Sequence, residues 1–230
     1  MTVNRVALSI ECLNSVDPRT LQEQALEALR AAITSGQYRP GDHLGEVELA
    51  KHLGVSRGTV RQALWHLQNE GLVTAGNRSM LRVNGLTSGE VRELFRVRAA
   101  LEGLAVRQLM ASPDVDTSVG KLREALSRLA DADADADMHL AGQVEADISF
   151  HLQLCRLSGN SMLVESWRFL EGRMRVVIMS AGPEQAPAMM TRNRHEPIID
   201  AIESADSSIA VAVVNEHMAA AADHFAHVAS

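Results

Sequence analysis

The sequence predicts a mainly α-helical fold in two parts, a small helical unit closed by a β-hairpin and a larger all-helical bundle. Hydrophobic residues make up 46% of the chain but aromatic residues only 3%, which favours helices packed on helices. Apolar residues recur at helical spacing throughout the second half, whereas a hairpin pattern occurs near residue 75. We therefore expect a loose extension over 1–16, a first domain over 17–85 and a second over 86–230.

Helices at 19–35, Glu46–Leu53 and from the N-cap Ser56 to about Asn69 are predicted for the first domain. The first of them carries apolar residues at positions expected to share its inward face: Leu21, Ala25, Ala28, Leu29 and Ala32. The third has a matching inward stripe: Val60, Ala63, Leu64 and Leu67. Two β-prone pieces, 72–74 and 80–83, follow around a polar tip and form a small wing.

Six helical patterns are predicted in the second half, at 87–110, 116–131, 138–157, 161–180, 193–204 and 207–227. Thr87 and Glu90 form a capping box at the start of the first of these. Asn193 is the expected N-cap of the fifth, which would put Pro197 in a first turn. The Ala/Asp run at 130–137 is interpreted as a solvated helix end or loop, with calcium ligation as the alternative.

The net charge of −7 is unfavourable for a nucleic-acid-binding protein only if it is spread evenly. Residues 17–85 contain eight Lys/Arg against seven Asp/Glu, and residues 1–16 are neutral overall. The acidity therefore belongs to residues 86–230, and charge does not exclude nucleic-acid binding by the first domain.

Helix, short helix, tight turn, helix and wing is the order that places one helix in the major groove of DNA. Ser56 at the start of the third helix offers a hydroxyl and free amides to a phosphate. Arg57 and Arg61 lie one turn apart and suit the O6/N7 edge of guanine, while Thr59 and Gln62 suit a thymine methyl or adenine. From this helix alone, a solvated surface helix explains the arginines equally well.

The flanking sequence resembles the GntR family of bacterial regulators over about 70 residues. The matching positions follow one another in order: Gly36-Gln37-Tyr38-Arg39-Pro40-Gly41, Leu44, Glu46, Glu48-Leu49-Ala50, Leu53-Gly54-Val55-Ser56-Arg57, Val60-Arg61, Ala63-Leu64, Leu67 and Glu70-Gly71-Leu72-Val73. The resemblance implies a winged helix-turn-helix, with the motif proper over about Glu46–Trp65. It also implies a homodimer on a short palindromic operator, with Arg57 and Arg61 reading bases. Asn77 and Arg78 of the wing complete the predicted DNA-binding residues.

Three positions depart from the family pattern. Val47 stands where relatives often carry a DNA-contacting arginine, and Gly58 where Pro or Thr is usual. The tip at 77–79 lacks the glycine that commonly lets the wing approach the minor groove. The fold prediction does not depend on these positions, but the operator sequence of relatives is not expected to transfer.

Polar residues stand at inward positions of the second domain. Asp147 and His151 are one turn apart within an apolar stripe, and His195 and His217 each share a face with aliphatic residues of a different helix. Burial requires that such groups be hydrogen-bonded, paired or metal-bound. A lone inward histidine is most often a satisfied core residue. One carboxylate with three imidazoles instead suits a divalent ion such as Zn, Ni or Mn.

Residues 90–227 resemble the FadR-type C-terminal ligand domain, often called FCD. The resemblance is carried by Asp147-Ile148-Ser149-Phe150-His151, then Ser158-Gly159-Asn160, His195 and His217. It implies a helical bundle in which an Asp and three His hold a metal at the floor of a cavity, and all four positions are present here. Acyl-CoA-binding members lack this full set, so that ligand class is not expected.

Arg98 falls inside the apolar stripe of its helix and, if buried, needs an anionic partner. One interpretation is an internal salt bridge to an acidic residue. The other is that Arg98 and open metal positions hold the carboxylate of a small organic acid. The FCD resemblance favours the second, because the matching arginine lines the effector cavity in the family.

These observations predict a ligand-responsive repressor that binds double-stranded DNA. One rival interpretation is the same regulator with a purely structural metal. The other is a metal-dependent enzyme, since such a site could activate water, but no second carboxylate or nucleophile stands out beside the four ligands. No apolar run approaches the length of a membrane span. Cys12 and Cys155 form no spaced pair and the N-terminus lacks a leader pattern, so a cytoplasmic protein is expected.

Overall fold

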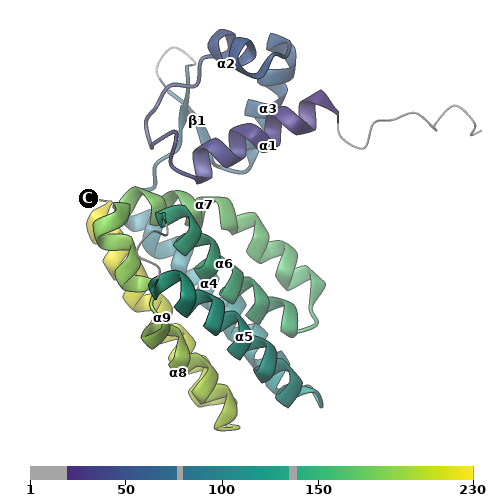
Figure 1. Cartoon of the computed structure of the whole chain (residues 1–230), viewed down its shortest axis with the longest axis vertical. Coiled ribbons are helices and arrows are strands. Elements are labelled where there is room, and N and C mark those ends of the chain that lie inside the picture. Colours follow the sequence, from purple (N-terminus) through teal and green to yellow (C-terminus); the bar gives the residue numbers. More distant parts are fainter. Residues whose placement is uncertain (1–19, 77–79, 135–138, 230) are drawn as a thin grey trace, which may run out of the picture.

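The computed structural model describes residues 20–76, 80–134 and 139–229. Figure 1 shows two parts, a small N-terminal head and a larger bundle of long helices beneath it. The head contains one two-stranded sheet, and the rest of the described chain is helical apart from turns and connections. The predicted fold class, a winged helix-turn-helix followed by an all-helical domain, is confirmed.

The head is built from α1 (Leu21–Thr34), α2 (Glu46–Leu53), α3 (Arg57–Asn69), β1 (Val73–Ala75) and β2 (Leu81–Val83). The strands are antiparallel, with Val73 opposite Val83. Gly54 ends α2 in the left-handed conformation, with φ +66°, which glycine adopts without steric cost, and α3 begins three residues later. This tight turn fixes α3 against α2 and α1.

The bundle is built from α4 (Ser88–Met110), α5 (Val115–Ala134), α6 (Leu140–Leu157), α7 (Ser161–Gln185), α8 (Arg192–Glu203) and α9 (Ser207–Val228). A short 3-10 turn, η3 (Ala186–Met189), joins α7 to α8. The predicted capping box is present, because Thr87 and Glu90 bond each other's backbone amides at the start of α4. Helix α7 is kinked near its end at Gly182, which has φ +74° and is followed by Pro183.

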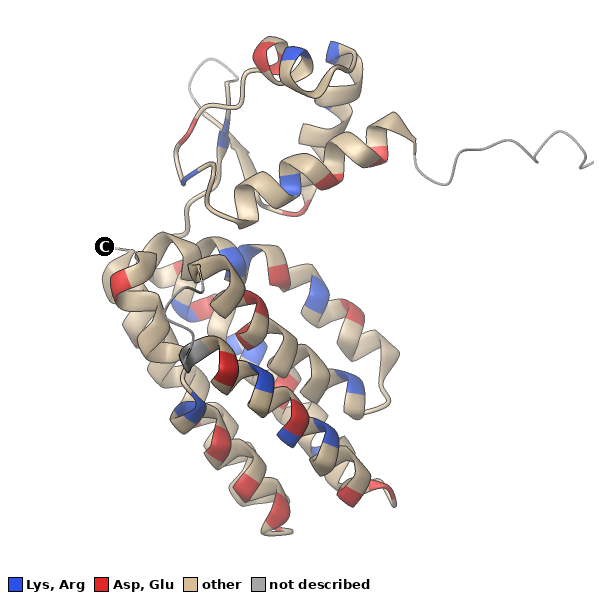
Figure 2. Ribbon diagram, in the orientation of Figure 1, with Lys and Arg blue, Asp and Glu red and all other residues tan. Residues whose placement is uncertain are grey.

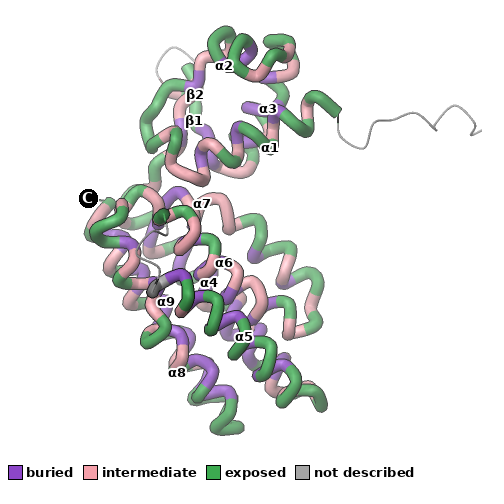
Figure 3. The backbone as a smooth tube through the Cα atoms, in the orientation of Figure 1, coloured by how far each residue is buried: buried purple, intermediate pink, exposed green. Residues whose placement is uncertain are grey.

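Helix α4 is central to the bundle because it packs against α6, α7 and α9. Figure 3 shows buried residues along the facing sides of these helices and exposed residues on their outer sides. The head has a hydrophobic core of its own, and α7 contributes Val176 to it. Helix α7 also packs against α1, so the two parts are in direct contact.

Three details differ from the sequence predictions. The buried face of α1 is Ala25, Leu29 and Ile33, whereas Leu21 and Ala28 are exposed, because the contact with α3 follows strict i, i+4 spacing. Thr191, not Asn193, occupies the N-cap position of α8, so Pro197 lies in the second turn. Helix α5 continues to Ala134, and the rest of the predicted 130–137 loop lies outside the described residues.

Figure 2 shows acidic and basic residues interspersed on the outer sides of the bundle helices. Among the helices that the structure describes, none is long and apolar enough to cross a membrane.

Candidate DNA-reading helix and metal centre

Helix α3 presents its polar residues to solvent as predicted. Val60, Ala63, Leu64 and Leu67 are buried in the head core, which leaves the opposite face outward. Arg57, Arg61 and Gln62 are exposed and Thr59 is half-buried. Ser56 caps the helix, because its hydroxyl oxygen accepts a hydrogen bond from the Thr59 amide at 3.1 Å. The Ser56 and Thr59 hydroxyls lie 2.8 Å apart, and when Thr59 is the donor of this hydrogen bond the Ser56 hydroxyl proton is free to meet a phosphate.

Arg61 has a partner that the sequence did not reveal. Its Nε and Nη2 donate to the two carboxylate oxygens of Glu46 on α2, at 2.9 and 2.8 Å. The hydrogen bond with Arg61 lowers the pKa of the Glu46 carboxyl, so Glu46 is a committed anion at neutral pH. The fork geometry fixes the plane of the Arg61 guanidinium while its side chain stays exposed.

Two large apolar side chains are exposed on and beside α3. Val47 on α2 and Trp65 on α3 are both exposed, at 63% and 59%. Trp65 follows Arg57 and Arg61 at intervals of four residues, so the three share one outward stripe. The predicted wing contacts Asn77 and Arg78 lie outside the described residues.

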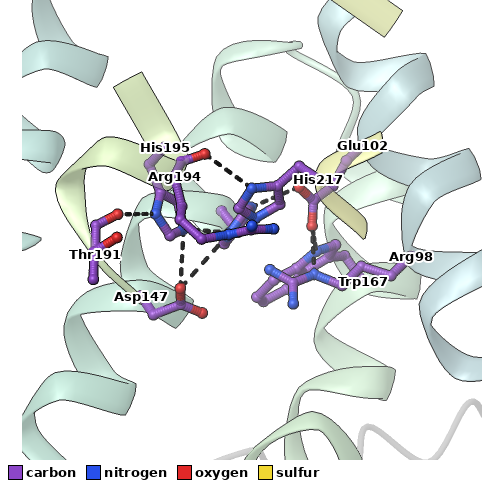
Figure 4. A network of polar contacts seen from close by, with 9 residues as sticks. Arg98, Glu102, Asp147, Trp167, Thr191, Arg194, His195 and His217 are labelled. Carbon is purple, nitrogen blue, oxygen red and sulfur yellow. Dashed lines mark hydrogen bonds and ion pairs between the residues drawn. The ribbon is translucent and has the colours of Figure 1, made fainter. Parts of the chain in front are cut away.

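The second site is a buried polar cluster drawn from separate helices, shown in Figure 4. Helix α6 supplies Asp147 and His151, α8 supplies His195 and α9 supplies His217. The ligand-type nitrogens of the three histidines all lie within 4.8 Å of one another. Asp147 Oδ1 lies 3.0 Å from His195 Nε2 and 3.9 Å from His151 Nε2. The structure therefore brings together all four residues singled out from the sequence.

Each histidine of the cluster has its Nδ1 atom next to an oxygen acceptor. His151 Nδ1 lies 2.7 Å from Glu102 Oε2, His195 Nδ1 lies 2.8 Å from the Thr191 carbonyl oxygen, and His217 Nδ1 lies 3.0 Å from the carbonyl oxygen of Arg194. Such partners fix the proton on Nδ1 and leave the Nε2 lone pair as the free acceptor. The three rings thus have the tautomer of metal-ligating imidazoles.

The Nε2 atoms of the histidines face one another, and there is no hydrogen-bond donor for each of their lone pairs. His151 Nε2 and His195 Nε2 are 3.1 Å apart, and His195 Nε2 also faces the Asp147 carboxylate. Burial by itself would raise the pKa of Asp147, but the polar contact with His195 and the positive charge of Arg98 hold it below its usual range, so the carboxylate is ionised. Lone pairs converging on a carboxylate in a buried place require a proton or a cation between them. The residues present therefore fit a divalent metal ion.

Burial lowers the pKa values of His151 and His217 well below the usual histidine range. The charge of Arg98 acts in the same direction on both. Both imidazoles are consequently neutral at physiological pH, which is the form that binds metals.

Arg98 on α4 forms a salt bridge with Glu102, one turn further along the helix. Arg98 Nε donates to Glu102 Oε1 at 2.7 Å, and both side chains are almost completely buried. The same oxygen also accepts a hydrogen bond from Trp167 Nε1 on α7, at 2.9 Å. Glu102 thus connects an arginine, a tryptophan and, through its other oxygen, the metal-site residue His151.

The salt bridge leaves part of Arg98 unpaired. Within the described chain, Arg98 Nη2 and Arg194 Nε are the buried side-chain nitrogens that have no hydrogen-bond partner. Both residues belong to the network of Figure 4. A buried guanidinium N–H without an acceptor is costly, and an anion placed there would remove the cost.

The first interpretation of Arg98, an internal salt bridge, is confirmed by its contact with Glu102. The second, an effector carboxylate held by Arg98, stays a prediction for the nitrogen that the bridge leaves unpaired. The expectation that no second carboxylate lies beside the metal-site residues is wrong, since Glu102 contacts His151. Glu102 could have been found from its spacing, because it follows Arg98 at i+4 on the same inward stripe. Trp167 carried no such signal, since a buried tryptophan is an ordinary core residue.

Two protein families match the chain. Residues 21–83 match the gntR family of bacterial regulatory proteins, and residues 93–220 match the FCD domain. The "Probable D-xylose utilization operon transcriptional repressor" of Paenarthrobacter nicotinovorans is 26% identical over 208 residues, 90% of each chain.

Two solved structures have the same arrangement. A GntR-type regulator from Rhodococcus sp. RHA1 is 25% identical with a TM-score of 0.74, covering 89% of this chain and 96% of its own. The McbR/YncC protein of E. coli is 22% identical with a TM-score of 0.73, covering 91% and 98%. At this identity the second likeness shows the fold alone.

Proposed function

Because the chain belongs to the GntR family of bacterial transcriptional regulators and carries an FCD domain, we propose that it is a homodimeric repressor controlled by a small organic acid. The acid would bind at a divalent-metal site in the bundle and change the affinity of the heads for a palindromic operator. The chain is a transcriptional regulator rather than an enzyme, as its relatives are named regulators. Its head is assigned to residues 17–85 and its effector domain to 86–230.

DNA binding is assigned to the outward face of α3 and to the wing. Arg57, Arg61 and Gln62 are exposed side by side, which supports direct reading of bases in the major groove. The assignment is completed by residues that contact phosphate or the minor groove: Ser56, Thr59, Asn77 and Arg78. Operator DNA lies in the cytoplasm, so that is the proposed location.

The metal is assigned to Asp147, His151, His195 and His217, as Zn, Ni or Mn. The observation that carries this proposal is the convergence of Nε2 atoms whose rings are each fixed through Nδ1. Such a metal would supply a Lewis-acidic position for an oxygen of the effector. The residues of the chain orient the imidazoles and keep them neutral.

The effector carboxylate is assigned to Arg98 together with the metal. The unpaired Arg98 Nη2 supports this assignment, since it is buried and lacks an acceptor. A ligand changes operator affinity only by as much as it prefers one arrangement of the heads over another. A small acid that satisfies Arg98 in one arrangement would supply such a preference.

A purely structural metal is the second candidate, and the Arg98–Glu102 bridge is the observation that favours it. In that case the site would stabilise the bundle without responding to acids. The two candidates differ in whether any small carboxylate changes DNA binding.

The test begins with full-length, untagged protein loaded with Zn²⁺ and a random DNA pool from which a binding sequence is selected. Mobility shifts at several salt concentrations then give the affinity with and without each member of a panel of small carboxylates. We expect a palindromic sequence, and at least one acid that both raises the melting temperature and weakens DNA binding. Arg98→Gln should keep DNA binding and lose the response. If no acid changes the melting temperature or the DNA affinity of the metal-loaded protein, the metal has a purely structural role.

A further inference from the structure

Helix α7 contacts both the buried site and the head. At Trp167 it donates a hydrogen bond to Glu102, beside the metal-site histidines. At Val176 it enters the hydrophobic core of the head. The two residues are nine positions apart, about 13 Å along a helix that rises 1.5 Å per residue. One rigid element therefore spans the distance between the two places.

The contact with the head is specific and involves the end of the reading helix. Arg173 Nε donates to the carbonyl oxygen of Glu70, the C-cap residue of α3, at 3.0 Å. The next residue, Gly71, has φ +75°, and a side chain there would overlap the Arg173 guanidinium. Glu70 in turn holds Arg30 of α1 through two hydrogen bonds, at 3.0 and 2.6 Å. Arg173 thus fixes the point where α1 and α3 meet.

A second contact locks α7 to the hairpin side of the head. A Cβ atom at Gly172 would lie 3.1 Å from the Leu72 side chain, closer than ordinary van der Waals contact, so Leu72 packs directly against the α7 backbone at this glycine. Leu72 is buried immediately before β1. Movement of α7 must therefore displace the junction between α3 and the wing.

The contact with the buried site is equally constrained. Glu102 Oε1 accepts from both Trp167 and Arg98, and Oε2 lies next to His151 Nδ1. Trp167 is fully buried and the Arg98 guanidinium lies 5.9 Å from the centre of its ring. A change in the position of His151 or Arg98 therefore reaches Glu102 and then Trp167, because these side chains are joined by direct hydrogen bonds.

We infer that α7 transmits the state of the buried site to the reading head, with Trp167 and Arg173 as its two positioning residues. The inference rests on the proposed function, which assigns a ligand to that site. It adds the route by which the ligand acts on DNA binding. A ligand that displaces Glu102 on binding would shift Trp167 and move α7 along its axis. This movement would reorient α3 through Arg173.

The covalent connection to α4 offers a competing route. Asn84, between β2 and α4, donates to the Gly71 carbonyl oxygen at 2.9 Å, so α4 also reaches the end of α3. Arg98 and Glu102 lie on α4, so a shift of that helix could move the head without α7. The experiment must separate Arg173 from Asn84.

The test uses hydrogen–deuterium exchange of full-length, untagged protein before and after addition of ZnCl₂, with no DNA or acid. In the wild type we expect zinc to change exchange in peptides covering 67–76, around the α3–β1 junction. Arg173→Gln should bind zinc with unchanged affinity by calorimetry and lose the change at 67–76. Trp167→Phe should do the same, because an aromatic side chain is kept, although a smaller one, while the hydrogen bond to Glu102 is removed. Arg173→Lys, which keeps a donor, should restore part of the change.

The matched control is Arg168→Gln, the same substitution at an exposed position of α7, which should behave as the wild type. A full zinc response in Arg173→Gln, or a response abolished by Asn84→Ala but not by Arg173→Gln, would overturn the inference. So would a wild type that binds zinc without any change at 67–76, and that result would leave the metal site standing. A wild type that binds no zinc would overturn the metal site as well.

Discussion

The head and the bundle use charged side chains in opposite ways. On α3, Arg57 and Arg61 are exposed, and Arg61 pairs with Glu46 at the surface, where solvent and DNA can reach it. In the bundle, Arg98 and Glu102 are sealed from solvent, at 2% and 0% exposed. Exposed ion pairs contribute little to stability, whereas breaking a buried pair leaves a charge that nothing compensates. We therefore expect substitutions in the head to change binding and substitutions in the bundle to change folding as well.

The largest expected effect is the loss of the buried carboxylate. Glu102→Ala leaves the Arg98 guanidinium, the Trp167 indole N–H and the His151 Nδ1 proton without their acceptor. Removing one partner of a buried pair costs about 3–5 kcal/mol. Urea denaturation of metal-free protein, followed by circular dichroism, should show a loss of this size.

An exposed carboxylate of the same bundle provides the control. Glu203 pairs with Arg123 at the surface, and both side chains are about two-fifths exposed. Glu203→Ala should cost less than about 1 kcal/mol, because solvent replaces the lost partner. Equal losses for the two substitutions would contradict the contrast between the two kinds of charge.

The next largest effect concerns the head. A bidentate contact between arginine and guanine is worth about 1–3 kcal/mol, so Arg57→Ala and Arg61→Ala should each weaken binding to the selected operator by about 10- to 100-fold. Mobility shifts at fixed salt measure this, and unfolding stability should hardly change. Arg168→Ala, an exposed arginine of the bundle, should have no effect on DNA binding. Specific binding that survives both head substitutions would mean that α3 is not the reading helix.

The order of the helices and most of their first residues could be predicted because the signals for them are local. Ser56 as N-cap, Gly54 in the left-handed conformation and the Thr87–Glu90 box each act within a few residues of the helix end. The face of α1 was predicted only in part, since Ala25 and Leu29 are buried but Leu21 and Ala28 are exposed. Which apolar residues are buried depends on contacts with α3, a distant segment. Asn193 is not the N-cap of α8 because the helix begins one residue earlier, at Arg192, with Thr191 in the cap position.

The buried site could be predicted only in part. Asp147 and the histidines could be identified because each is a polar residue on the apolar face of its helix. A buried polar group in such a position needs a hydrogen bond, an ion pair or a metal. The partners of those residues come from other helices, and sequence spacing does not give the pairing. Trp167 and the contact between Glu102 and His151 were missed for this reason, and so was the bond between Arg61 and Glu46.

The smallest effect compares one motif that occurs in both regions. Thr20–Glu23 opens α1 in the head and Thr87–Glu90 opens α4 in the bundle, and both are complete capping boxes. Thr87→Ala should cost about 1 kcal/mol of stability. This loss should appear in the unfolding of the bundle, because the capped helix α4 is central to it. Thr20→Ala should affect only the unfolding of the head, because Thr20 caps α1. Differential scanning calorimetry can follow both transitions.

The capping box also sets a pH dependence. Hydrogen bonds from the Thr87 backbone amide and then its hydroxyl lower the pKa of Glu90 below 4.5. The stabilisation is therefore present above that pH and is lost as the pH falls through the folded-state pKa. Glu90→Gln should remove this dependence, and an unchanged acid limb of the stability profile would contradict it.

The metal content of untagged protein tests the central claim most directly. Inductively coupled plasma mass spectrometry should find Zn, Ni or Mn at one ion per chain in the wild type. His195→Ala should lose the ion, because it removes a nitrogen that lies 3.0 Å from Asp147 and 3.1 Å from His151 Nε2. His224→Ala should keep it, because that ring bonds the Gln185 carbonyl oxygen instead. Wild-type protein that carries no metal and binds none on titration would contradict the account of the buried site.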